Sequence, residues 1–145
     1  MKTIVLYYTF GGSTKAEAVK IAKERGATLC QVEETKKRGM LSAFFSGCPK
    51  AAKRKASEIK PISYNLKEFD RIIIGGPIWA GHPAPAINAI FNTLPSGKEV
   101  ELFFCSGGGE TPKSSEGTKN LVVQKGCKLI SYRDVKSGQG MRKEK

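Results

Sequence analysis

Glycines and hydroxyl-bearing residues gather in one short stretch near the start of the chain, directly after an apolar run. The run Ile4–Tyr8 leads into Thr9-Phe-Gly-Gly-Ser-Thr14, and apolar residues at helical spacing follow. Backbone N–H groups, three hydroxyls and the positive end of a helix dipole could together bind a phosphate or another small oxyanion. The pattern also fits a plain structural turn. It is neither G-x-x-x-x-G-K-S/T nor G-x-G-x-x-G, so nucleoside triphosphate hydrolysis and Rossmann-type dinucleotide binding are disfavoured.

Two more apolar runs end in glycine-rich loops. Arg71–Gly76 and Val100–Cys105 show no polar alternation, which is typical of strands buried on both faces. The first run leads to Trp79 and the single histidine, His82, and the second opens into Ser106-Gly-Gly-Gly109. A large aromatic side chain beside bare backbone could bind a planar ring. Trp79 could instead be a core residue, and His82 a solvated one.

Alternating strands and helices must position these loops. The pattern predicts strands at 3–8, 27–32, 71–76, 100–105 and 127–133, and helices at 13–25, 50–59, 85–93 and 115–125. Gly26 is the expected C-terminal cap of the first helix. This alternation predicts a parallel sheet with helices on its faces. Because ligands bind beyond the carboxyl ends of such strands, we expect the loops 9–14, 77–82 and 105–110 to converge on one site.

The composition limits the class of protein. The chain has 145 residues and a formal net charge of +12, with basic residues concentrated between 36 and 60. This charge could attract nucleic acid, an anionic membrane surface or an acidic protein. The four cysteines form no C-x-x-C pair and the histidine stands alone, so we expect free thiols and no metal site. No apolar run reaches the roughly 20 residues of a membrane span, and no signal-peptide pattern is present, so we expect a cytoplasmic protein.

The three loops together resemble those of the flavodoxin-like family. Thr9-Phe-Gly-Gly-Ser-Thr14 is similar to the family's S/T-x-T-G-N-T phosphate loop, with Gly11 and Ser13 as departures. Gly76-Pro-Ile-Trp-Ala-Gly81 is similar to S-P-I-Y-W-G, with Ala80 in place of the second aromatic, and Cys105-Ser-Gly-Gly108 matches the third loop. The resemblance implies a three-layer α/β fold around a five-stranded parallel sheet of order 2-1-3-4-5. The domain would span residues 1–134, followed by a flexible basic tail at 135–145.

The resemblance also implies a cofactor, flavin mononucleotide (FMN), and the residues that bind it. Residues of the first loop would hold the phosphate: Thr9, Gly11, Gly12, Ser13 and Thr14. Residues of the second loop would line one side of the isoalloxazine: Pro77, Ile78, Trp79, Ala80 and Gly81, with His82 as a donor beside them. Backbone groups of the third loop would line the other side: Ser106, Gly107, Gly108 and Gly109. No catalytic side chain is implied.

Electron transfer through bound FMN is the function that this reading favours, because the cofactor carries the redox chemistry. One alternative is an FMN-dependent reductase of quinones or similar acceptors that turns over with NAD(P)H; a carrier is favoured over such a self-sufficient enzyme. Another is a nucleic-acid or membrane-surface binding module, supported only by the basic segment 36–60. A chain of this charge should attract an acidic redox partner, and nucleic acid is disfavoured.

Family members usually add a last helix on the face that carries the first helix, and this chain lacks it. The runs Ile72–Ile74 and Leu102–Phe104 nevertheless predict cover on both faces of the sheet. We therefore expect that face to be covered by a second subunit, giving a homodimer, or by residues 40–59 folded back over it.

Overall fold

A parallel sheet forms the centre of the computed structural model, which describes residues 1–36, 39, 46–108 and 111–136. Its strands lie in the order β2-β1-β3-β5-β6, which confirms the predicted arrangement. Their bounds are β1 Thr3–Tyr7, β2 Thr28–Gln31, β3 Arg71–Trp79, β5 Glu99–Ser106 and β6 Lys128–Lys136. A short sixth strand, β4 (His82–Pro83), pairs antiparallel with the end of β3.

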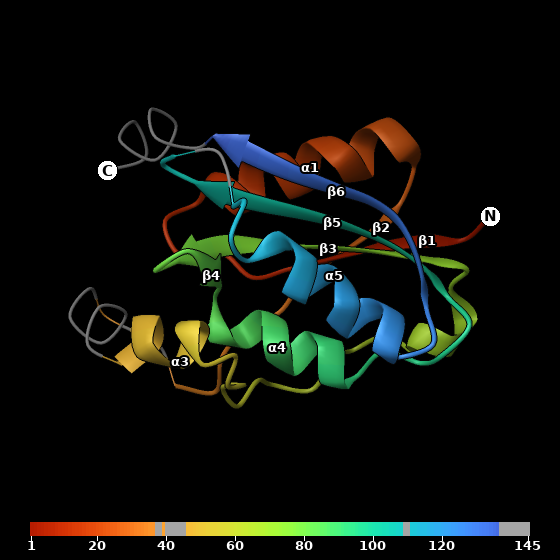
Figure 1. Cartoon of the computed structure of the whole chain (residues 1–145). Coiled ribbons are helices and arrows are strands. Elements are labelled where there is room, and N and C mark those ends of the chain that lie inside the picture. The colour runs from red at the N-terminus through yellow and green to blue at the C-terminus, as the bar shows by residue number, and fades with distance from the viewer. Residues whose placement is uncertain (37–38, 40–45, 109–110, 137–145) are drawn as a thin grey trace.

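Helices cover both faces of the sheet and make the fold three-layered. Helix α1 (Ser13–Arg25) lies on one face, and α3 (Cys48–Ala52), α4 (Pro85–Asn92) and α5 (Ser115–Gln124) lie on the other (Figure 1). A 3₁₀ turn, η2 (Leu66–Glu68), precedes β3. Gly26 caps α1 in the left-handed conformation, as predicted. No helix in the described ranges is long and apolar enough to cross a membrane.

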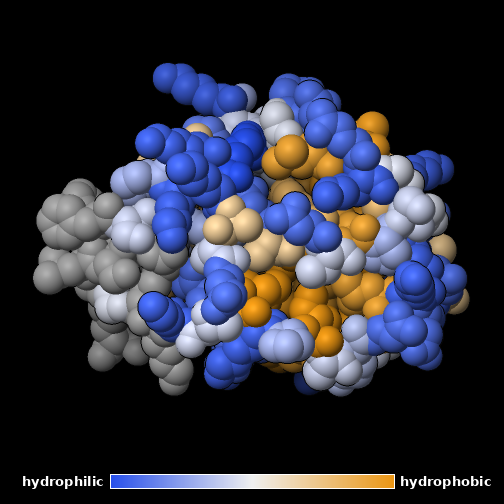
Figure 2. Space-filling view, turned by 90° about the horizontal axis from the view of Figure 1, so that it is seen from below, coloured by the Kyte–Doolittle hydropathy of each residue, from blue (hydrophilic) through white to orange (hydrophobic). Residues whose placement is uncertain are grey.

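Two apolar layers form the core, one on each face of the sheet. The larger lies toward α4 and α5 and includes Ile72, Ile74 and Phe104. The smaller lies under α1 and includes Val5, Ile73 and Phe103. Seen from the side of α3, α4 and α5, some apolar surface shows among hydrophilic side chains (Figure 2). The free cysteines Cys30, Cys105 and Cys127 are buried in this core, and Cys48 is a partly exposed free thiol.

Within the described part of the chain, α1 is the helix on its face of the sheet, and side chains of the sheet itself complete the cover. Phe103 is 1% exposed, and its ring lies over Gly75, where a Cβ atom would stand only 1.9 Å from Phe103 Cζ. Glu101 projects from the same face of β5, since it stands two residues before Phe103. Ion pairs therefore complete the cover: Arg25 Nη1 and Arg71 Nη1 lie 2.6 and 2.9 Å from Glu101 Oε2, and Arg71 Nη2 lies 2.6 Å from Glu99 Oε1.

The prediction that residues 40–59 fold over the α1 face is wrong for the part that the structure describes. Arg54 donates to Thr118 Oγ1 of α5, and Asn88 of α4 donates to the Lys55 carbonyl, both on the opposite face. Residues 40–45 lie outside the described part of the chain. Burial of Ile73 and Phe103 requires no second subunit, so the homodimer stays a prediction.

The predicted helix at 50–59 is also wrong in extent. Helix α3 ends at Ala52, and Arg54 adopts a left-handed φ of 54°, which stops a right-handed helix. The Arg54 guanidinium donates 2.9 Å hydrogen bonds to Thr118 Oγ1 and to the Ser114 carbonyl. The tertiary contact with α5 therefore prevails over the local helical propensity of a lysine- and alanine-rich segment.

The segment that connects β2 to β3 is closed by hydrogen bonds between residues near its start, 33–35, and residues further along it, 58–60. Glu34 and Ile59 form an antiparallel bridge, Thr35 N donates to Glu58 O at 3.0 Å, and Lys60 N donates to Glu33 O at 2.8 Å. We call this pairing the crossover stem. At the other end of the chain β6 continues to Lys136, so Val135 and Lys136, expected in the tail, belong to the sheet. Residues 137–145 lie outside the described part.

Candidate functional site

The three glycine-rich loops lie at one edge of the sheet, where the carboxyl ends of β1, β3 and β5 are neighbours (Figure 1). Tyr8 N donates to Gly75 O at 3.0 Å, and Pro77 of β3 pairs with Cys105 of β5. A small hollow is lined by residues 9–14 together with Pro77 and Cys105. The structure thus confirms that these loops converge.

The first loop is shaped by two glycines. Gly11 and Gly12 have φ angles of 146° and 99°, a region that other residues rarely adopt. Gly12 N donates a 3.1 Å hydrogen bond to Thr9 Oγ1, which closes the turn. Gly12 is the N-cap of α1, so no side chain caps the helix, and its first turn contains no acidic residue.

The start of α1 offers donors that match a phosphate. The first N–H groups of a helix have no partner within it, and the helix dipole makes this end positive. Ser13 Oγ is buried and has no hydrogen-bond partner among the residues that the structure describes. A buried hydroxyl without a partner needs an explanation. An anion at the uncapped helix end supplies one, so the donor set fits a phosphate group.

Cys105 borders this hollow as a packing residue. It is 4% exposed. Burial raises the pKa of its thiol, and a hydrogen bond with Thr14 lowers it by less. The raised pKa favours the neutral thiol, which is the weaker nucleophile, and this fits a packing role for Cys105.

The second loop, which the sequence predicted only as a loop after the strand, is a β-hairpin. Strand β3 continues through Pro77, Ile78 and Trp79, and Trp79 pairs with His82 of β4. Between them, Ala80 and Gly81 have φ angles of 52° and 82°. Two central residues with positive φ define the type I′ turn, which matches the twist of paired strands.

Trp79 belongs to an aromatic cluster that joins the first and second loops. Its ring meets Tyr8 and Phe10 edge-on, with centroid separations of 6.0 and 5.4 Å. Tyr8 and Phe10 were not among the predicted site residues, although Phe10 stands inside the predicted phosphate loop. His82 Nδ1 lies 3.3 Å from the Ala80 carbonyl, which holds the imidazole at the hairpin turn.

The third loop leaves β5 with little bulk. Ser106 is partly buried, whereas Gly107 and Gly108 are exposed, with no heavy atom near the position of a Cβ. A planar ligand could therefore approach the backbone closely. Gly109 lies outside the described residues, so its predicted role stays a prediction.

The fold of this chain is similar to those of several solved structures. No protein-family model and no curated protein matches the chain. Among solved structures it is similar to a Lactobacillus acidophilus flavoprotein in complex with FMN (26% identity, 92% of this chain and 93% of that one, TM-score 0.77). The apo form of the flavoprotein from the same organism also matches (27% identity, 92% and 91% covered, TM-score 0.69).

A flavodoxin, WrbA-like protein from Agrobacterium tumefaciens shares the fold at 16% identity (99% and 88% covered, TM-score 0.61). The chain therefore has the flavodoxin-like α/β fold, and the resemblance seen in its three loops is confirmed at the level of the fold.

Proposed function

We propose that this chain binds FMN at the carboxyl edge of its sheet and transfers electrons to and from other redox proteins. The observation that carries the proposal is the uncapped start of α1, where the buried Ser13 hydroxyl has no partner in the described part of the chain. The similar Lactobacillus acidophilus flavoprotein crystallised with FMN supports the choice of ligand.

Each loop has a distinct task in this proposal. The first loop would bind the phosphate through its backbone N–H groups and through Thr9, Ser13 and Thr14. The hairpin would hold one side of the flavin ring with Trp79, and the backbone of Ser106–Gly108 would hold the other. Bound flavin supplies one- and two-electron chemistry, so the chain needs only to bind, orient and partly shield it.

The charge around this edge favours an acidic redox partner. Seven exposed lysines stand near the carboxyl ends of the strands or at the nearby helix ends, and the described residues give none of them a carboxylate partner: Lys15, Lys36, Lys50, Lys53, Lys55, Lys113 and Lys136. Two of the described acidic residues at this edge are paired with basic side chains, Glu17 with Arg133 and Glu33 with Lys60. We call the seven exposed lysines the basic rim. Complementary charge would steer an acidic protein toward the flavin.

The phosphate contact can be tested by comparing FMN with riboflavin, which lacks the phosphate. Hydrogen bonds to charged groups contribute about 1.5–3 kcal/mol, so Ser13→Ala should weaken FMN binding about tenfold or more, measured by quenching of flavin fluorescence. Riboflavin affinity should not change. Ser96→Ala, an exposed serine between α4 and β5, is the matched control.

Equal effects of Ser13→Ala on both flavins, or no FMN binding at micromolar concentration, would refute the proposal. Steady turnover of the FMN-loaded chain with NAD(P)H and a quinone would instead identify a reductase. Salt-sensitive RNA retention without flavin affinity would favour the nucleic-acid module.

A further inference from the structure

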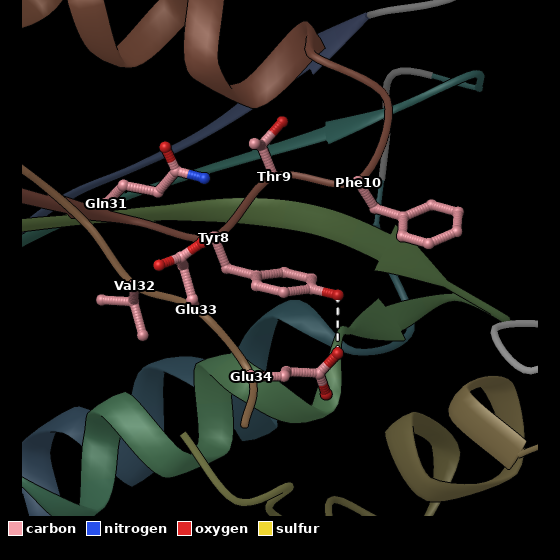
Figure 3. A pocket seen from close by; sticks show the side chains of 7 residues that line it. All are labelled: Tyr8, Thr9, Phe10, Gln31, Val32, Glu33 and Glu34. Carbon is pink, nitrogen blue, oxygen red and sulfur yellow. Dashed lines mark hydrogen bonds between the residues drawn. The ribbon is translucent and has the colours of Figure 1, made fainter. Parts of the chain in front are cut away.

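Two loops of the proposed flavin site are held from outside by carboxylates. On the β2 side, Tyr8, which directly precedes the first loop, donates a 2.8 Å hydrogen bond to Glu34 Oε1 in the wall of a pocket of about 250 Å³ (Figure 3). On the opposite side, Thr111 is the first described residue after the third loop, and it is 3% exposed. Asp134 of β6 is hydrogen-bonded to it. The third loop therefore ends at a buried residue that an outer strand holds.

Asp134 accepts hydrogen bonds from both polar donors of Thr111. Thr111 Oγ1 lies 2.6 Å from Asp134 Oδ1, and Thr111 N lies 3.3 Å from Asp134 Oδ2. A carboxylate only accepts hydrogen bonds, so the single hydroxyl proton of Thr111 points to Asp134. The Tyr132 hydroxyl, 2.5 Å from Thr111 Oγ1, is then the donor to it. Burial raises the pKa of Tyr132, which keeps this phenol protonated. We call Thr111, Tyr132 and Asp134 the β6 anchor.

The β6 anchor is itself fixed to the sheet and to the following helix. The Tyr132 ring packs against Phe104 of β5, with ring centroids 5.5 Å apart. The Thr111 carbonyl accepts a 3.0 Å hydrogen bond from Ser115 N at the start of α5. At the other end of the third loop, Ser106 is still part of β5. Both ends of this short loop therefore have fixed positions.

Fixed ends matter because the described residues between them are glycines. Gly107 and Gly108 are exposed, and among the described atoms none lies near the position of a Cβ in either. Glycine loses more conformational freedom on ordering than any other residue, and side-chain packing does not restrict it here. A loop that becomes ordered only when a ligand binds weakens that binding by the entropy it loses. An anchor at Thr111 lowers this cost before any ligand arrives.

We propose that Asp134 is a positioning residue for flavin binding, which holds Thr111 and thereby fixes the backbone of Ser106–Gly108 beside the ring. This inference rests on the proposed function. Asp134 suits the task because it is an exposed carboxylate that pairs with no basic side chain in the described part of the chain, so its hydrogen bonds go to Thr111. Asp134 needs no contact with the flavin. Its effect should therefore fall on binding of the ring, whatever group the flavin carries beyond it.

The test measures the affinities of FMN, riboflavin and lumiflavin, which is the ring without its ribityl chain, by fluorescence quenching on the full chain. Asp134→Asn keeps the shape of the side chain but can accept from only one of the two Thr111 donors. All three flavins should bind about fivefold more weakly, and by the same factor, because a hydrogen bond to a charged group is lost behind the loop that lines the ring. Ser13→Ala, in contrast, should weaken FMN alone.

Two Thr111 variants and a matched control complete the test. Thr111→Val removes the hydroxyl and should weaken the three flavins in the same way, with little further loss when combined with Asp134→Asn. Thr111→Ser keeps the hydroxyl and should bind flavins as the native chain does. Asp70→Asn is the control, because Asp70 is also an exposed carboxylate bound to a backbone N–H, that of Lys2 at 2.7 Å, but it precedes β3 at the opposite edge of the sheet. It should change none of these affinities.

A measurement without flavin checks the anchor directly. The amide NMR signals of Gly107 and Gly108 should shift in Asp134→Asn and stay in place in Asp70→Asn. Unchanged signals, unchanged lumiflavin affinity, a loss confined to FMN, or a loss as large in Thr111→Ser as in Thr111→Val would overturn the inference and leave the proposed function intact. A native chain that binds no flavin would overturn both. If Asp134→Asn does not fold, the two Thr111 variants still decide.

Discussion

Replacing Glu101 by glutamine should reveal how much the ion pairs over the α1 face stabilise the fold. The Glu101 side chain is 9% exposed and accepts from Arg25 at 2.6 and 2.7 Å, from Arg71 at 2.9 Å and from Ser131 at 3.2 Å. Removing one partner of a buried pair costs about 3–5 kcal/mol. Arg25 is 42% and Arg71 23% exposed, so water can partly solvate both after the change. We therefore expect a loss of about 2–3 kcal/mol, which corresponds to roughly 5–10 °C in Tm for a chain of this length.

The same carboxylate predicts a pH dependence. The hydrogen bonds from Arg25, and then the charges of both arginines, hold the pKa of Glu101 below its usual value. A lowered pKa in the folded state means that the stabilisation is complete above the unfolded-state pKa and disappears as pH falls through the folded-state pKa. The difference in unfolding free energy between the native chain and Glu101→Gln should thus be constant from pH 7 to about pH 5 and shrink below about pH 4.5.

Urea unfolding followed by circular dichroism at a series of pH values measures this difference directly. Glu116→Gln, at a carboxylate that is 80% exposed, is the control and should cost less than about 0.5 kcal/mol. A Glu101→Gln variant as stable as the native chain, or a difference that persists unchanged to pH 3, would contradict the assigned role of the ion pairs.

Three further predictions concern the packing, the hairpin and the basic rim. Gly75→Ala should destabilise the fold by about 3 kcal/mol or more in urea unfolding, because its Cβ would overlap the Phe103 ring, and adding Phe103→Leu should restore part of the loss. Ala80→Gly should raise the free energy of unfolding by about 0.5–1 kcal/mol, because glycine adopts the left-handed φ of this position at lower cost. The control Ala56→Gly, in an exposed segment, should lower the free energy of unfolding slightly. With FMN bound, electron exchange with a small acidic iron–sulfur protein should slow as salt is added, and Lys50→Glu with Lys53→Glu should remove most of that salt dependence; a rate that ignores salt would contradict the proposed docking.

The sequence pattern correctly predicted the features that depend on residues close together in the chain. The apolar runs around Ile73 and Phe103 predict central strands, and Gly26 predicts the end of α1, because burial on both faces and a left-handed cap leave signatures within a few residues. Convergence of the three loops followed from strand order alone. These predictions therefore needed no knowledge of particular tertiary contacts.

Other features depend on contacts between distant residues. The end of α3 is fixed by Arg54 reaching α5, sixty residues further along the chain. The cover of the α1 face depends on Arg25, Arg71 and Glu101 meeting from three separate elements, which no pattern in one segment reveals. The aromatic cluster of Tyr8, Phe10 and Trp79 was likewise visible only once β1 and the hairpin were adjacent.

The crossover stem has a consequence for how this protein can vary. Its hydrogen bonds join residues 33–35 to residues 58–60, so the intervening chain begins and ends at the same place beside β2. The entropy of closing such a loop grows only slowly with its length. Residues inserted between the two sides of the stem would therefore leave the register of the sheet unchanged. Residues 36–57, which lie between the two sides of the stem, are therefore the segment in which insertions can add binding surface while the flavodoxin-like fold stays intact.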